Sequence, residues 1–414
     1  MGSRFLHPDP RRSGGVTAGS GQQHRVRGRS CPRASALGVS AAQWPKLCAR
    51  PPREKALDTG LSTCRARWGG GTVSGMRPGT RDEPGADARP PEAARAPGNT
   101  AAEPRILSID RLRGVLVILM VGGDHLAGVE VVPAFLKHAP DIGLTIADTV
   151  APAFVFVIGL NYGPSFARRM RRGTAPAVRH FVVRYLALIG IGAIIAAGAT
   201  TFAAQPTDWG VLQAIGVAGL ICLPAIRLPA WARFGVGLLV LWGYQVALDA
   251  FMLPSVLHSV QGGLFGALSW GALLLMSTAV ADVWRSGLRP YGICCALLVV
   301  AATIAAVLVP VSKVRVSLSY VLVTLAISAL VFLAFDLASR VVAQRPGFFC
   351  WWGENALALY VLHLVILAIV VVPPVAWWYV GAPYWLAAAQ LAVILAVLSA
   401  VAWWAHRRGI RMDL

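Results

Sequence analysis

The chain has 414 residues, of which 56% are hydrophobic and only 14% are charged. Soluble domains carry about 25% charged residues, so this composition excludes an ordinary soluble enzyme and indicates a membrane protein. The formal net charge of +19 is shared between a polar N-terminal region and short loops between apolar segments. Basic loops of that kind set membrane topology, and we expect no nucleic-acid partner.

Residues 1–104 are rich in Arg, Gly, Pro, Ser and Ala and show no periodic apolar residues. Such a segment cannot bury enough apolar surface to offset its ordering entropy. The sequence therefore predicts a disordered basic tail at 1–104, followed by a transmembrane domain at 105–414. Met76 is an alternative start, in which case residues 1–75 are absent from the native protein.

The transmembrane domain alternates apolar runs with short polar loops, and a spanning helix needs about 20 mostly apolar residues. We predict an all-α polytopic membrane protein with about ten transmembrane helices, because lipid cannot satisfy an open backbone. The predicted helices are 110–129, 143–166, 181–203, 209–226, 232–252, 262–283, 290–310, 317–338, 350–372 and 385–405.

Basic residues divide the loops into two sets. Arginines recur before the first helix, between the second and third, and in every second loop after that, up to the C-terminus. The intervening loops carry only Lys137, Lys313 and Arg315. By the positive-inside rule, both termini are predicted to be cytoplasmic, and the loop that holds Lys137 and His138 faces the opposite side.

The stretch from Lys137 to Gly159 carries the first candidate site. His138 lies in a polar loop, and Asp148 follows ten residues later inside an apolar helix, where an ionisable residue is costly and indicates function. If the loop folds back over the helix start, the carboxylate fixes the imidazole tautomer and raises its basicity, as acyl transfer requires. The alternative is a solvated loop histidine and an unrelated carboxylate that packs between helices.

Further polar residues lie within or at the ends of apolar segments. Asp124 and His125 are adjacent near the end of the first predicted helix and are either interfacial or catalytic. Asn355 and His363 fall within one segment, and His363 lies near mid-depth, where an unpaired imidazole is costly. Asp208 is expected to be a water-facing residue at a helix start.

Other site classes have no support in the sequence. The seven cysteines form no CxxC pair, and no Cys/His cluster has metal-ligand spacing, so we expect no metal site. A Walker loop, a Rossmann glycine pattern and a GxSxG elbow are also absent from the sequence.

Four blocks together resemble a known family. They are RILSIDRLRG (105–114), KHAPDIGLTIADTVAPAFVFVIG (137–159), GVLQAIGV (210–217) and GENALALYVLH (353–363). In this order they are similar to the catalytic domain of the heparan-alpha-glucosaminide N-acetyltransferase family, in a bacterial-type form within the broader membrane acyltransferases. The resemblance extends over about residues 104–414, and the second block is the most specific.

The resemblance implies an acetyltransferase that moves an acetyl group from cytosolic acetyl-CoA to an amino sugar or other glycan on the non-cytoplasmic side. Acetyl-CoA is then a co-substrate, and no cofactor is bound permanently. The family's active histidine corresponds to His138 and its helix aspartate to Asp148, while Asn355 and His363 match its last block. The resemblance further implies a multi-pass protein of a bacterial plasma membrane, with a second copy of the chain as partner in a homodimer.

The sequence departs from the family at two places. Asp124, followed by His125, stands where an amide residue is usual, and Ala214 stands where a basic residue is usual. Asp124 and His125 are therefore added to the catalytic candidates. Arginines on the predicted cytoplasmic face could hold the phosphates of CoA, and the candidates are Arg111, Arg113 and Arg184.

A second class of function fits the same architecture. Intramembrane Asp and His residues also occur in proton-coupled carriers. A proton-coupled transporter or flippase without acyl-transfer chemistry is therefore the alternative hypothesis, and acetyl-CoA binding would separate the two.

Overall fold

The computed structural model describes residues 106–199, 209–341, 346–373 and 375–411, and these form α-helices and connecting loops without a β-strand. The predicted tail at 1–104 and Asp208 lie outside the described residues. The helices are α1 (Leu107–Ala127), α2 (Ile146–Met170), α3 (Thr174–Ala199), α4 (Val211–Ala225), α5 (Ala230–Ala247), α6 (Leu253–Leu257), α7 (Gly263–Ser286), α8 (Leu288–Leu308), α9 (Leu318–Val341), α10 (Phe348–Glu354), α11 (Ala356–Val371) and α12 (Tyr384–Arg407).

Each of the ten predicted segments contains a helix, but the predicted count of ten spans is not confirmed. Among the described residues, seven helices are long and apolar enough to cross a membrane, or eight if a bent pair counts as one span. The shortfall has two local causes. The 15 residues of α4 reach only about 22 Å, and α1 carries charged residues near both of its ends.

The predicted helix 350–372 is broken in the structure. It consists of α10 and α11, whose axes differ by 87°, and Asn355 between them has non-helical backbone angles. Hydropathy alone does not reveal such a bend, because the apolar character of the sequence continues through it.

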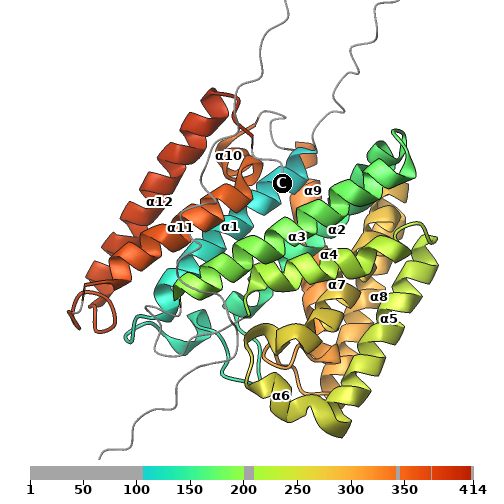
Figure 1. Ribbon diagram of the computed structural model, residues 1–414, viewed down its shortest axis with the longest axis horizontal. Helices are drawn as coiled ribbons and strands as arrows, with labels where there is room; N and C mark the ends of the chain where they lie inside the picture. Colours follow the sequence, from blue (N-terminus) through green and yellow to red (C-terminus); the bar gives the residue numbers. More distant parts are fainter. Residues whose placement is uncertain (1–105, 200–208, 342–345, 374, 412–414) are drawn as a thin grey trace, which may run out of the picture. The chain divides into compact units, whose positions relative to one another are not determined.

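Helix α7 forms the centre of one part of the bundle, where it packs against α2, α4 and α5 (Figure 1). In the most apolar stretch of this helix, 83% of the residues are buried inside the protein. Small residues permit this, because they let helix backbones approach closely in lipid. A Cβ atom at Gly159 of α2 would lie 2.6 Å from the Cβ of Ser277, and one at Gly237 of α5 would lie 2.7 Å from Met276.

Helix α1 connects this part of the bundle to the C-terminal helices, since it contacts α2 and α9 as well as α10, α11 and α12. Its crossing with α10 brings two backbones together. A Cβ atom at Gly114 would lie 1.9 Å from the carbonyl oxygen of Phe349, and one at Gly353 would lie 2.1 Å from that of Asp110. Glycine is required at both positions, and the crossing fixes α1 against the C-terminal helices.

Candidate active site

The loop before α2 folds back over the start of that helix and brings His138 to Asp148. The His138 Nδ1 atom lies 2.8 Å from Asp148 Oδ1. The histidine side chain is 41% exposed and the aspartate side chain is fully buried. The contact between His138 and Asp148 that the sequence analysis considered is therefore present. The imidazole is partly open to solvent, and the carboxylate is buried.

Asp148 is held by the turn that starts α2. Its Oδ2 atom accepts hydrogen bonds from the Thr145 backbone N–H at 3.1 Å, the Thr145 hydroxyl at 2.9 Å and the Ala139 backbone N–H at 3.2 Å. Thr145 and Asp148 form a capping box, which satisfies free N–H groups at a helix start. Because several donors converge on this carboxylate, it is stabilised as an anion, and it is fixed in place for His138.

Lys313, from the loop between α8 and α9, completes the group. Its Nζ atom lies 2.9 Å from His138 Nδ1 and 3.6 Å from Asp148 Oδ1. Burial lowers the pKa of Lys313, while the negative charges of Asp148 and Asp124 oppose that shift. From the sequence, Lys313 was assigned a role in topology only. It is one of few basic residues in its set of loops, and that rarity could have marked it as a candidate site residue.

A second ion pair joins the two loops that carry His138 and Lys313. Arg315 Nε donates to Asp141 Oδ1 at 2.9 Å, and Ser312 Oγ donates to the same oxygen at 2.7 Å. A backbone bridge between Ile142 and Ser312 lies beside it. The Arg315 guanidinium holds the pKa of Asp141 below its usual value. We call Asp141, Ser312 and Arg315 the loop clasp.

The loop that carries Lys313 contains a strained residue. Val316 has φ +49°, which is a true outlier for a β-branched residue, and its side chain is fully buried. Hydrogen bonds surround it: the Val316 N–H donates to the Lys313 carbonyl, and Ser317 exchanges bonds with Ser312. Such strain persists only where the surroundings enforce it, so the position of Lys313 is strongly determined.

Asp124 and His363 form a second acid–imidazole pair. Asp124 Oδ2 of α1 lies 3.0 Å from His363 Nε2 of α11, and the His363 side chain is buried. The negative charge of Asp124 also opposes the lowering of the Lys313 pKa. His125 points elsewhere: it is buried, its Nε2 lies 3.3 Å from the Ala387 carbonyl of α12, and its ring packs on that of Tyr379.

The structure does not bring Asn355 to this group. Its amide donates to the Ile410 carbonyl at 3.1 Å, at the end of α11 that lies near the start of α1. His363 is eight residues further along the helix, about 12 Å by helical rise. The expected roles of Asn355 and His363 in catalysis stay predictions.

The three arginines predicted to contact CoA occupy two helices. Arg111 Nη1 donates to Ser339 Oγ at 3.0 Å, and Arg113 Nη1 donates to the Gly353 carbonyl at 3.3 Å. Arg184 lies on α3 with its guanidinium over the Tyr185 ring. Ser339 lies near the last turn of α9, whereas Lys313 precedes its first turn, so Arg111 and His138 lie about 30 Å apart along that helix.

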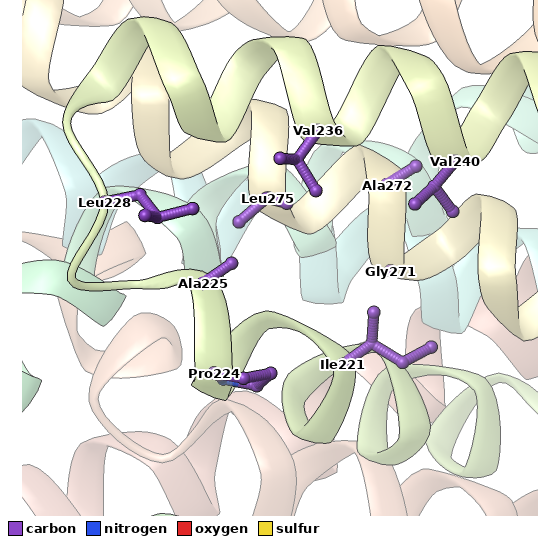
Figure 2. Close-up of a pocket in the computed structure, with 9 residues that line it drawn as sticks. All are labelled: Ile221, Pro224, Ala225, Leu228, Val236, Val240, Gly271, Ala272 and Leu275. Atoms are coloured by element: carbon purple, nitrogen blue, oxygen red, sulfur yellow. The ribbon is translucent and has the colours of Figure 1, made fainter.

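No group of three or more metal-ligating side chains occurs among the described residues. An apolar groove of about 340 Å³ lies between α4, α5 and α7 (Figure 2). Its nine lining residues, drawn in Figure 2, are all apolar or glycine, so it offers no acid, base or nucleophile.

Comparisons with known proteins agree with the resemblance over the first three of the four blocks. Residues 105–264 match the family described as heparan-alpha-glucosaminide N-acetyltransferase, catalytic. The human protein heparan-alpha-glucosaminide N-acetyltransferase (Homo sapiens) is 35% identical over 126 residues, which cover 28% of this chain and 18% of the human protein. The mouse protein of the same name (Mus musculus) is 33% identical over 135 residues, covering 31% of this chain and 19% of the mouse protein.

The aligned regions thus span under a fifth of each relative's length. The family match includes His138, Asp148 and the first three blocks, and it ends before the loop that holds Lys313 and before the fourth block. The chain is a multi-pass membrane protein whose residues 105–264 carry the sequence pattern of the heparan-alpha-glucosaminide N-acetyltransferase catalytic family.

Proposed function

We propose that this chain is a transmembrane acetyltransferase that moves an acetyl group from cytosolic acetyl-CoA to an amino sugar or other glycan amine beyond the membrane. The observation that carries the proposal is the half-exposed His138 imidazole held at 2.8 Å by the buried Asp148 carboxylate. The same arrangement activates histidine as a base or nucleophile in acyl transfer. The names of the human and mouse relatives point to glucosamine as the class of acceptor.

In the direct route, the acceptor nitrogen attacks the thioester carbonyl while His138 Nε2 takes a proton from that nitrogen. The new C–N bond forms, the C–S bond breaks, and Nε2 returns the proton to the departing sulfur of CoA. In the two-step route, Nε2 attacks the thioester carbonyl, the acetyl–Nε2 bond forms, and the C–S bond breaks with departure of the CoA thiolate. The acceptor amine then attacks the acetyl group, the C–N bond forms as the acetyl–Nε2 bond breaks, and the amine proton goes to the CoA thiolate. Both routes need a free electron pair on Nε2, which Asp148 provides by accepting a hydrogen bond from Nδ1–H.

The arginine distribution supports a donor that enters from the opposite face. If the N-terminus is cytoplasmic, as the loop charges predict, and α1 crosses the membrane, Arg111 and Arg113 lie on the side of CoA, and His138 lies on the side of the acceptor. The roughly 30 Å between the two ends of α9 then has to be bridged by the extended pantetheine arm. In a bacterial plasma membrane, the acceptor on the side of His138 would be a cell-wall or secreted glycan.

The test uses inside-out membrane vesicles that contain the full chain. Acetyl-labelled CoA is supplied outside, and a panel of amino sugars is trapped inside. We expect label on a lumenal sugar with the wild type and none with His138→Ala, while His258→Ala, a second exposed loop histidine, retains transfer. Equal transfer by His138→Ala would remove His138 from the mechanism. Absence of both transfer and acetyl-CoA binding would favour a transporter.

A further inference from the structure

The Nδ1 atom of His138 lies between two groups of opposite charge. Asp148 Oδ1 is 2.8 Å away and Lys313 Nζ is 2.9 Å away. A carboxylate only accepts hydrogen bonds and an ammonium only donates them. One ring nitrogen therefore cannot satisfy both partners at once, and its protonation state decides which of them it bonds.

The two partners have different effects on the catalytic nitrogen. Asp148 favours a proton on Nδ1, which leaves Nε2 with its electron pair, but it also favours a second proton on the ring. A positive charge on Lys313 opposes the doubly protonated imidazolium, because like charges a few ångströms apart repel. Together they favour a neutral ring. Where Nδ1 bonds Asp148, it carries the proton and Nε2 keeps the electron pair that acyl transfer needs.

The structure holds Lys313 at this place rather than leaving it to sample solvent. Its side chain is only 10% exposed. Its loop is fixed to the His138 loop by the loop clasp, and the strained Val316 lies three residues further on. Burying a lysine is costly unless it is paired, and Asp148 at 3.6 Å supplies the partner.

Other charged groups near His138 have partners of their own. Asp141 and Arg315 pair with each other, and Arg315 also feels the charge of Asp249. Asp124 pairs with His363. These pairs leave Lys313 as the cation that directly faces the imidazole.

The neighbouring cation in sequence serves as a natural control. Lys137 precedes His138, but its Nζ donates to the Glu130 carbonyl at 3.4 Å. It lies outside the group formed by His138, Asp148 and Lys313, although it carries the same charge.

We propose that Lys313 is a positioning residue whose charge opposes a second proton on the His138 imidazole, so that the ring stays singly protonated beside Asp148. The proposal rests on the proposed function for its meaning in catalysis. The electrostatic coupling between Lys313 and His138 can be measured whether or not the protein transfers acetyl groups.

The test measures protonation of His138 without turnover. Diethyl pyrocarbonate modifies neutral imidazole, so its rate of reaction with the peptide that contains His138, followed by mass spectrometry against pH, gives the midpoint of protonation. The full chain is used in lipid nanodiscs, as wild type, Lys313→Met, Lys313→Gln, Lys313→Arg and Lys137→Met. Thermal unfolding of each variant checks that it is folded.

We expect both neutral variants to move the midpoint to higher pH by about one unit, from a unit charge a few ångströms away in a partly solvated site. Lys313→Arg and Lys137→Met should stay near the wild type. An unchanged midpoint in both neutral variants would overturn the proposal. A shift in Lys313→Arg as large as that in Lys313→Met would also overturn it, because the effect would then come from fit and not from charge.

Acetyl transfer in vesicles provides the second readout. The acidic limb of the rate profile should move by the same amount as the midpoint of modification. If the wild type transfers no acetyl group but the midpoint shifts as expected, the proposed function fails while the coupling of Lys313 to His138 stands.

Discussion

Replacing Asp148 with asparagine separates the structural role of this residue from its chemical role. The carboxylate accepts three hydrogen bonds at Oδ2 from Ala139 and Thr145, and one at Oδ1 from His138 Nδ1. An asparagine can keep its oxygen toward the three donors and turn its NH₂ toward His138. In that orientation the helix start remains satisfied, and Nδ1 becomes an acceptor.

The consequences can be estimated from these contacts. All four hydrogen bonds to the carboxylate change from charge-assisted to neutral, so we expect a loss of roughly 1 kcal/mol for each in the free energy of unfolding. The imidazole proton moves to Nε2, the wrong nitrogen for a base, and a comparable change in a Ser-His-Asp triad lowers turnover about 10⁴-fold. Acetyl transfer by Asp148→Asn should therefore fall by roughly 10³-fold to 10⁴-fold.

Two measurements check this reasoning. Vesicle transfer assays give the rate, and ¹⁵N spectra of histidine-labelled protein report which ring nitrogen of His138 carries the proton. Asp148→Ala is the contrasting variant: it leaves all of these donors without a partner, at about 1–3 kcal/mol for each one that stays buried, and should lower the unfolding temperature much further. Transfer by Asp148→Asn within tenfold of the wild type, or an unchanged tautomer, would refute the assigned role.

Two further predictions concern packing and pH. Gly114→Ala should prevent stable folding, because its Cβ would lie 1.9 Å from a carbonyl oxygen of α10. Gly122→Ala on the same helix has nothing within 4 Å of its Cβ and should be neutral or stabilising by up to about 1 kcal/mol. Equal unfolding temperatures for these two variants would contradict the close crossing of α1 and α10. Asp141→Asn should destabilise the protein by under about 1 kcal/mol, since the pair with Arg315 is partly exposed. Arg315 lowers the pKa of Asp141, so this contribution is present above about pH 4 and is lost as the pH falls further. A difference in unfolding temperature from wild type that does not shrink as the pH falls below about 4 would argue against it.

The sequence alone determined the local features of this protein. A hydrophobic run is a local property, so each of the ten predicted segments contains a helix, and the charge of the loops between them could be read directly. His138 and Asp148 are only ten residues apart, and a capped helix start joins them, so their contact could be anticipated from the chain itself. The resemblance to the acetyltransferase family was also carried by contiguous blocks.

The tertiary structure decided what depends on distant parts of the chain. The 87° break at Asn355 adds to the short α4 and the charged ends of α1 in reducing the number of helices that can span, and hydropathy does not register the break. Asp124 and His363 were candidates as single residues, but their pairing across 239 positions follows from the packing of α1 against α11. Lys313 lies 175 positions after His138, and the packing of the two loops brings it there. A contact of that sequence separation leaves no periodic or compositional trace in the chain.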